Sequence, residues 1–224
     1  MEKEKILGMV DHTILKQDAT WDDVKNLIND AINFHTYSVC ISPCFVKQAK
    51  KYIGSQNMKI CTVIGFPNGV NTTNVKMIET NEAICNGANE IDMVINIGKV
   101  KEKDYDYIRN ELKSLVSLCH RPNSNVILKV IVETALLTED EIRDLTYICQ
   151  ECKVDFIKTS TGFSTRGASF RDVEIISEEI SKMQGTLKIK AAGGISSFED
   201  AQKFIDLGAS RLGTSRLVKI AKEN

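Results

Sequence analysis

Polar and apolar positions along the chain repeat one unit. Each unit opens with a short run of β-branched and other apolar residues, followed by a polar turn and an amphipathic stretch of ten or more residues. Successive runs begin 22 to 35 residues apart, which is close to the length of one strand–helix repeat. The eight predicted strands begin near Asp11, Tyr37, Lys59, Glu90, Asn125, Asp155, Leu187 and Arg211.

The stretches between these runs carry the start signals of helices. Thr20, Thr138 and Ser197 are each followed three residues later by an acidic residue, in the pattern of a capping box or a close variant. We also expect residues 2–9 to form a short helix that covers the lower end of the fold.

Strict alternation of eight strands with helices predicts a parallel sheet. An open, doubly wound sheet is the alternative, but it usually has five or six strands and often a glycine-rich first turn. Here the first turn reads LKQDAT, and the chain contains no GxGxxG sequence. We therefore predict an α/β fold with residues 1–224 in a single (β/α)8 TIM barrel, preceded by the short N-terminal helix.

Composition narrows the classes of protein to consider. The chain has 224 residues, of which 42% are apolar, enough for a sizeable core, and its net charge is -1. The absence of a basic excess argues against a surface for nucleic acid or membrane. The start, MEKEKILGMV, lacks the apolar core of a signal peptide, and seven cysteines show no disulfide-framework spacing. We expect a cytoplasmic protein.

Charged residues interrupt strands that should be continuously apolar in a parallel barrel. Asp92, Lys158 and Lys190 each lie within a predicted strand, and Lys129 lies in another. A single such lysine could simply extend outward between helices. Two lysines and an aspartate that converge would instead suit imine catalysis, because the nucleophile must be an unprotonated amine. Burial and a second ammonium depress a lysine pKa, and a carboxylate can move protons.

Glycines and hydroxyl residues follow the last three predicted strands, at the end of a barrel where enzymes bind phosphate. They form the triplets Ser160-Thr161-Gly162, Ala192-Gly193-Gly194 and Gly213-Thr214-Ser215. The alternative is that these glycines only turn the chain.

Metal chemistry has little support in the sequence. The histidines are dispersed, and no group of His, Cys and carboxylate has metal-ligand spacing. Cys149 and Cys152 are better explained by helix packing than by a redox pair. Cys40, in the second predicted strand, could face a pocket or serve as a small core residue. We predict no metal and no cofactor.

Eight motifs resemble, in order and across nearly the whole chain, the signatures of the deoxyribose-phosphate aldolase family. They are DHTIL, VCISP, TVIGFPNG, EIDMVINIG, LKVIVET, DFIKTSTGF, KAAGGI and RLGTS, of which KTSTGF and KAAGGI are the most specific. The resemblance implies a metal-free class I reaction, the reversible cleavage of 2-deoxy-D-ribose 5-phosphate to acetaldehyde and D-glyceraldehyde 3-phosphate.

The same resemblance implies roles for individual residues. Lys158 corresponds to the Schiff-base lysine, and Asp92 and Lys190 correspond to the proton-transfer pair. Asp11 and Cys40 correspond to pocket residues. The positions that correspond to the phosphate site are Gly193, Gly194, Gly213 and Ser215.

The chain departs from the family pattern near the expected phosphate site. Arg166 stands where bacterial members commonly have glycine, and Arg216 directly follows GTS. Either arginine could add charge to the site or lie on the surface.

Two other functions remain open, and so does the assembly. One is a phosphate-binding barrel enzyme that works without an imine. The other is a catalytically silent sensor of sugar phosphates. The expected partner is a sugar phosphate rather than nucleic acid or membrane, and a homodimer is one assembly left open.

Overall fold

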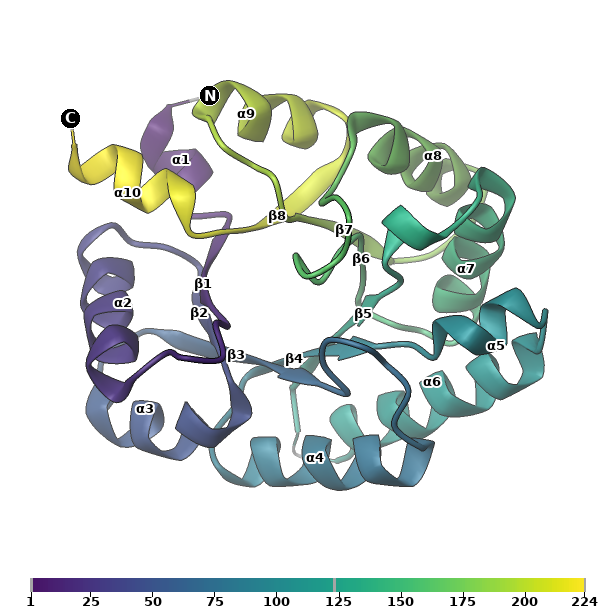
Figure 1. The fold of residues 1–224 in the computed structure, drawn as a ribbon, viewed down its shortest axis with the longest axis horizontal. Helices are drawn as coiled ribbons and strands as arrows, with labels where there is room; N and C mark the ends of the chain where they lie inside the picture. Colours follow the sequence, from purple (N-terminus) through teal and green to yellow (C-terminus); the bar gives the residue numbers. More distant parts are fainter. Residues whose placement is uncertain (1, 123, 224) are drawn as a thin grey trace.

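The computed structural model describes residues 2–122 and 124–223, in which eight parallel strands form a closed barrel (Figure 1). The strands follow one another around the barrel in chain order, and β8 pairs with β1 to close it. Each predicted strand start lies within two residues of an observed one. The strands are β1 (Val10–Ile14), β2 (Ser38–Ile41), β3 (Lys59–Ile64), β4 (Glu90–Val94), β5 (Ile127–Ile131), β6 (Phe156–Lys158), β7 (Lys188–Ala192) and β8 (Ala209–Thr214). The predicted fold class is confirmed.

Helices surround the barrel, and their starts follow the predicted signals. Thr20 and Thr138 form complete capping boxes, whereas Ser197 accepts a hydrogen bond from the N–H of Asp200 alone. Short 3-10 turns occupy Pro43–Phe45 and Thr134–Leu136. The helices are α1 (Lys3–Leu7), α2 (Trp21–Asn33), α3 (Val46–Ile53), α4 (Thr73–Cys85), α5 (Ile97–Lys101), α6 (Tyr105–Cys119), α7 (Glu139–Glu151), α8 (Phe170–Ser181), α9 (Phe198–Asp206) and α10 (Arg216–Lys222).

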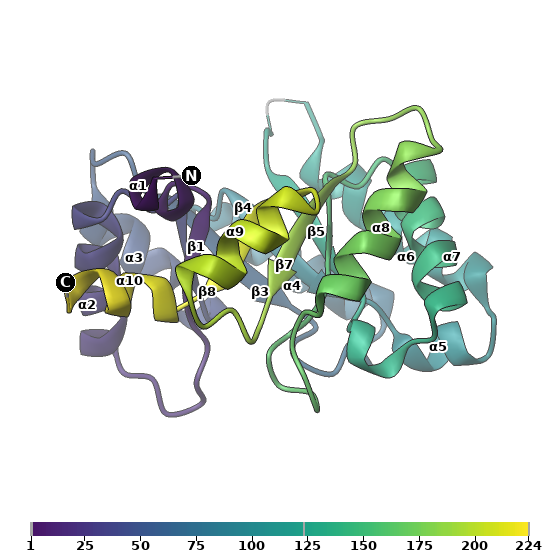
Figure 2. The same ribbon diagram turned by 90° about the horizontal axis from the view of Figure 1, so that it is seen from above.

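The short N-terminal helix is present, but its predicted position is wrong. Figures 1 and 2 show α1 at the periphery, beside α10 and α9, rather than across the end of the barrel. Ile6 and Leu7 are buried in the main hydrophobic core, so this amphipathic turn is held at the side of the molecule by apolar packing.

The two faces of each strand have different roles. Outward residues such as Val39, Leu128, Ile157 and Leu212 are fully buried in the main hydrophobic core. Since side chains alternate along a strand, their neighbours point into the barrel. The inward apolar cluster is small: its buried members are Cys40, Cys61 and Val63. The outer apolar layer therefore holds the barrel together and leaves the interior to charged groups.

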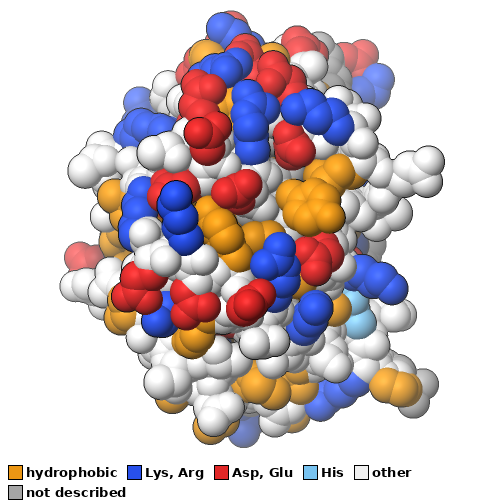
Figure 3. Space-filling view, turned by 90° about the vertical axis from the view of Figure 1, so that its right-hand side faces the viewer, with side chains coloured by type: hydrophobic (Ala, Val, Ile, Leu, Met, Phe, Trp, Pro, Cys, Tyr) orange, Lys and Arg blue, Asp and Glu red, His pale blue; other side chains and the backbone are white. Residues whose placement is uncertain are grey.

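The outer surface mixes charges of both signs. Acidic and basic side chains are interleaved over the face shown in Figure 3. Ion pairs connect neighbouring helices, as between Arg143 and Glu178 (3.3 Å) and between Arg171 and Glu139 (2.8 Å). Among the described residues, no helix combines the length and apolar character that a membrane span requires.

Candidate active site

The barrel brings the predicted lysines and aspartate together. Lys158 ends β6, and Lys190 is its register partner in β7. The Nζ atoms of both lysines lie 2.7 Å from the same atom, Oδ2 of Asp92 in β4. All three side chains are almost completely buried. The two lysines therefore point inward, and the alternative of outward, surface-seeking lysines does not hold.

A second carboxylate, that of Asp11 in β1, contacts Lys190. Oδ2 of Asp11 lies 2.5 Å from Lys190 Nζ. Its Oδ1 accepts hydrogen bonds from the Ser38 hydroxyl (2.7 Å) and from the guanidinium of Arg211 (2.9 Å). Asp11, which was predicted as a pocket residue, thus lies in the charged interior beneath the mouth.

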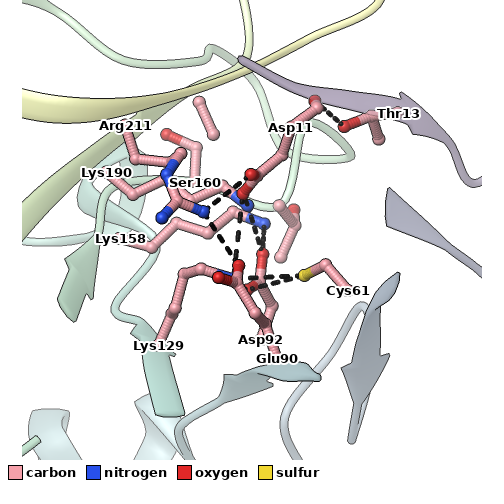
Figure 4. A network of polar contacts seen from close by, with 12 residues as sticks. Asp11, Thr13, Cys61, Glu90, Asp92, Lys129, Lys158, Ser160, Lys190 and Arg211 are labelled. Atoms are coloured by element: carbon pink, nitrogen blue, oxygen red, sulfur yellow. Dashed lines mark hydrogen bonds and ion pairs between the residues drawn. The ribbon is translucent and has the colours of Figure 1, made fainter. Parts of the chain in front are cut away.

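Three further charged residues complete this interior. The sequence marked Lys129 as a charged residue within a strand, but it did not reveal the part of Glu90 or Arg211. Lys129 lies 2.6 Å from Glu90 and 2.8 Å from Asp92, and Arg211 lies 2.8 Å from Glu90. Figure 4 shows these side chains reaching toward one another from different strands. One signal was available: Glu90 precedes Asp92 by two positions, so both point to the same face.

Opposite charges in the interior favour the charged forms of Asp92 and Lys190. Burial alone would raise the pKa of Asp92, but Lys129, Lys158 and Lys190 hold it well below its usual range. Burial likewise works to lower the pKa of Lys190, but Asp11 and Asp92 outweigh it and raise that pKa. The two lysine amines lie side by side, as expected, and a carboxylate oxygen of Asp92 contacts both of them.

A cavity of about 1050 Å³ opens at the C-terminal ends of the strands. Of the two lysines and the aspartate in the predicted set, Lys158 is the member that lines it. The cavity is also lined by predicted phosphate-site residues, namely Thr161, Gly162, Gly193, Gly194, Gly213 and Ser215. Cys40 lies deeper, fully buried in the small inward cluster.

The rim of the cavity offers backbone donors. Gly193 and Gly194 both have positive φ (78° and 77°), a conformation that glycine adopts without strain. Among the described residues, no acceptor is recorded for the N–H groups of Gly194 and Ser215, which both line the cavity. Free N–H groups on tight turns suit an anion such as phosphate.

The two arginines near this rim differ. Both terminal nitrogens of Arg166 contact the Asp172 carboxylate, at 2.5 and 3.1 Å. The guanidinium is therefore already paired with a residue at the start of α8. Arg216 is exposed and lines the cavity. Of the two, only Arg216 is placed to meet a ligand in this cavity.

Glu133 is a buried residue at the rim that the sequence did not single out. Its backbone has a φ of 54°, in the left-handed region, and its side chain is almost fully buried. Its carboxylate accepts hydrogen bonds from the N–H (3.2 Å) and the hydroxyl of Thr161. Glu133 thereby ties the end of β5 to the turn that follows Lys158.

Comparison with known proteins places the chain in a family. Residues 5–215 match the model of the DeoC/LacD family aldolases. The chain belongs to this family. A deoxyribose-phosphate aldolase of Streptococcus agalactiae is 51% identical over 222 residues, which cover 99% of this chain and 96% of that protein. One from Streptococcus pyogenes is 50% identical, with the same coverage.

Solved structures agree with the assignment of this chain to the aldolase family. A putative deoxyribose-phosphate aldolase from Coccidioides immitis has a TM-score of 0.95 and 35% identity, covering 100% of this chain and 87% of that chain. The tetrameric deoxyribose phosphate aldolase of Aeropyrum pernix has a TM-score of 0.87 and 28% identity, covering 99% and 92%.

In this aldolase, folding also groups sulfur and carboxylate atoms that are far apart in the sequence. Ligand atoms of Cys40, Cys61 and Asp92 lie within 4.8 Å of one another. Asp92 Oδ1, however, accepts from Lys129, and Oδ2 accepts from both Lys158 and Lys190. A metal cation here would compete with three lysine amines for the Asp92 carboxylate, so the donor set suits amine chemistry better than a metal.

Proposed function

We propose that this aldolase reversibly cleaves 2-deoxy-D-ribose 5-phosphate to acetaldehyde and D-glyceraldehyde 3-phosphate through a Schiff base on Lys158. The observation that carries the proposal is the position of Lys158. Its amine lines the cavity, while Asp92 and Lys190 lie directly behind it. The printed names of the streptococcal relatives support the choice of substrate.

Substrate binding uses the rim of the cavity. The phosphate binds the free N–H groups of Gly194 and Ser215, with the charge of Arg216 nearby. This anchoring directs the aldehyde end of the open-chain sugar toward Lys158. Fixing both ends of the substrate lowers the entropic cost of reaching the reactive geometry.

The chemistry begins with the neutral amine of Lys158, which attacks the C1 aldehyde. Loss of water from the resulting carbinolamine gives an iminium cation, which acts as the electron sink. Removal of the C3 hydroxyl proton then breaks the C2–C3 bond. Glyceraldehyde 3-phosphate leaves, and the two remaining carbons stay on Lys158 as an enamine.

Asp92 and Lys190 serve the proton-transfer steps. Since Asp11 and Asp92 raise the pKa of Lys190, this residue is an ammonium that can donate a proton. Asp92 contacts both lysines and can pass protons between them. Through water, the pair protonates the enamine carbon, and hydrolysis of the new iminium frees acetaldehyde.

Borohydride trapping tests this proposal. Reduction in the presence of acetaldehyde should add an ethyl group, about 28 Da, to Lys158, because borohydride converts the imine on that lysine to a stable secondary amine. Peptide mass mapping locates the label, and Lys158→Arg is the matched control that should remain unlabelled. Labelling of Lys190 would reverse the two roles. An unmodified wild-type protein would favour an acid–base enzyme without an imine or a silent sugar-phosphate sensor.

A further inference from the structure

The ion-paired interior of the barrel contains unequal numbers of opposite charges. Within the described residues, three carboxylates contact four groups that can carry positive charge (Figure 4). The carboxylates are Asp11, Glu90 and Asp92, and the cationic groups are Lys129, Lys158, Lys190 and Arg211. With every group ionised, the network has a net charge of one positive unit. It becomes neutral when one amine loses its proton.

Burial makes this imbalance costly. All seven side chains are at most 4% exposed. An unbalanced charge removed from water carries a large desolvation penalty, which the protein reduces by releasing or binding a proton. The interior therefore favours the state in which one of the lysines is neutral.

The ion pairs indicate which lysine that is. Lys129 lies within 4.0 Å of three carboxylates, with distances of 2.6, 2.8 and 3.7 Å. Lys190 contacts two, at 2.5 and 2.7 Å. Among the carboxylates of the described residues, Lys158 contacts that of Asp92 alone. Since Lys158 has the fewest carboxylate partners of the three lysines, its deprotonation loses the least electrostatic attraction to carboxylates.

Arg211 supplies the cation that makes the numbers unequal. Its guanidinium contacts Asp11 at 2.9 Å and Glu90 at 2.8 Å, and its carbon lies 3.3 Å from the ring centroid of Tyr37. Arg211 is not among the residues that line the cavity. A guanidinium remains protonated at any physiological pH, so this positive charge is permanent.

Other titratable groups face the network without adding to the ion pairs. Burial raises the pKa of the Cys61 thiol well above its ordinary value, which keeps that thiol neutral. The hydrogen bond with Cys61 lowers the pKa of Cys40. In the described residues, neither Glu133 nor Tyr37 has a recorded ion pair, and Glu133 is bound to Thr161.

We propose that Arg211 is a positioning residue that sets the number of protons in the network and so keeps Lys158 neutral. Arg211 pairs with Asp11 and Glu90, so its positive charge balances one of the three negative charges of the network. The two negative charges that remain cannot balance three protonated lysines. This inference rests on the proposed function, because it explains how Lys158 comes to be the neutral amine that forms the Schiff base.

The test is the pH dependence of acetaldehyde trapping at Lys158 with cyanoborohydride. Arg211→Gln makes the charges equal, so Lys158 should retain its proton to higher pH. The pH of half-maximal labelling should rise by about one unit or more, and labelling at neutral pH should fall about tenfold. Comparing variants under one protocol cancels the reagent's own dependence on pH.

Three companion variants separate charge from structure. Arg211→Lys preserves the charge and should leave the midpoint unchanged. Glu90→Gln removes one carboxylate and should lower the midpoint. The double variant Arg211→Gln with Glu90→Gln restores an excess of one positive charge and should return the midpoint toward that of the wild type. Because Glu90→Gln and Arg211→Lys are tested separately, the proposal stays falsifiable even if Arg211→Gln does not fold.

Two results would overturn the inference. One is an unchanged midpoint in Arg211→Gln or Glu90→Gln, and the other is a double variant that behaves like Arg211→Gln alone. Cys40→Ser tests whether the network contains three negative charges. If this variant lowers the pH midpoint of labelling as much as Glu90→Gln does, the Cys40 thiolate is a fourth anion. If wild-type protein is never labelled, the proposed function fails instead, which is a distinguishable outcome.

Discussion

At the scale of single residues, the two lysines of the proposed mechanism differ in their surroundings rather than in their chemistry. Lys190 lies between Asp11 and Asp92, whereas Lys158 borders the cavity and has one carboxylate partner, Asp92, in the described part of the chain. Two carboxylates hold the first amine charged, and the second can become the nucleophile. In the proposed mechanism, identical side chains thereby take opposite roles, Lys190 as proton donor and Lys158 as nucleophile.

Replacing Lys190 should therefore impair turnover more than binding. Lys190→Leu removes the proposed proton donor, and loss of an acid–base partner typically costs about 100-fold or more in rate. Affinity for a phosphate-bearing inhibitor should change little, because the phosphate binds the rim. Measurements of kcat and inhibitor affinity beside Arg216→Ala, which should show the reverse pattern, test this. A near-normal kcat in Lys190→Leu would remove the residue from the mechanism.

His12 should make stability depend on pH. Burial lowers the pKa of His12 to about 4, below its ordinary value of 6.5. Between these values the unfolded chain binds the proton and the folded protein does not, so stability rises with pH. The contribution of His12 is complete above about pH 6.5 and is lost as pH falls through 4, an effect on the order of 3 kcal/mol.

The measurement is urea unfolding of wild-type protein and His12→Gln at several pH values in this window. The variant should show a smaller loss of stability on acidification than the wild type does. Parallel curves for the two proteins would mean that other groups account for the acid sensitivity.

At the scale of secondary-structure elements, a buried ion pair joins two helices outside the barrel. Lys76 of α4 and Glu111 of α6 lie 2.8 Å apart, and both side chains are fully buried. Burial lowers the pKa of Lys76 and raises that of Glu111. Each group therefore relies on the other to remain charged, and neither can be removed alone without a large cost.

Lys76→Met should destabilise the protein by about 3–5 kcal/mol, because it leaves Glu111 buried without its cationic partner. Adding Glu111→Leu should recover most of that loss. The matched control is Lys99→Met, which breaks a partly exposed pair with Glu102 and should cost less than about 1 kcal/mol. Denaturant unfolding of the four proteins checks the prediction, which a double variant no more stable than Lys76→Met would contradict.

The elements also show where sequence reasoning succeeds and where it stops. Strand starts were predictable to within two residues because β-branched runs alternate with capped helices. The faces of the strands were not predictable, since both are buried in a barrel. The register that pairs Lys158 with Lys190, and the closure that brings Arg211 to Asp11, exist only in three dimensions. Glu133 gave no local signal at all.

At the scale of the whole molecule, the domain count and the assembly stay predictions. A single cooperative unfolding transition would support the one-domain prediction. Light scattering would decide whether the chain forms the homodimer that the sequence left open. The cytoplasmic location likewise stays a prediction.

Activity should survive prolonged treatment with EDTA. In the grouping around Cys40, Cys61 and Asp92, the carboxylate is already bound to lysine amines, so the interior should not require a metal cation. The measurement is the rate of substrate cleavage before and after chelation, followed by addition of Zn²⁺. Loss of activity on chelation and recovery with Zn²⁺ would rule out the amine mechanism.

The opposed faces of the strands also bear on how such a protein can change over evolutionary time. Ile157 belongs to the outer apolar layer, and its neighbour Lys158 points to the cavity. A mutation in the outer layer can adjust the melting temperature while the adjacent inward residue stays the same. Heat tolerance and chemistry are thus open to separate selection on one strand, and a lineage can adapt to a new habitat without altering its reaction.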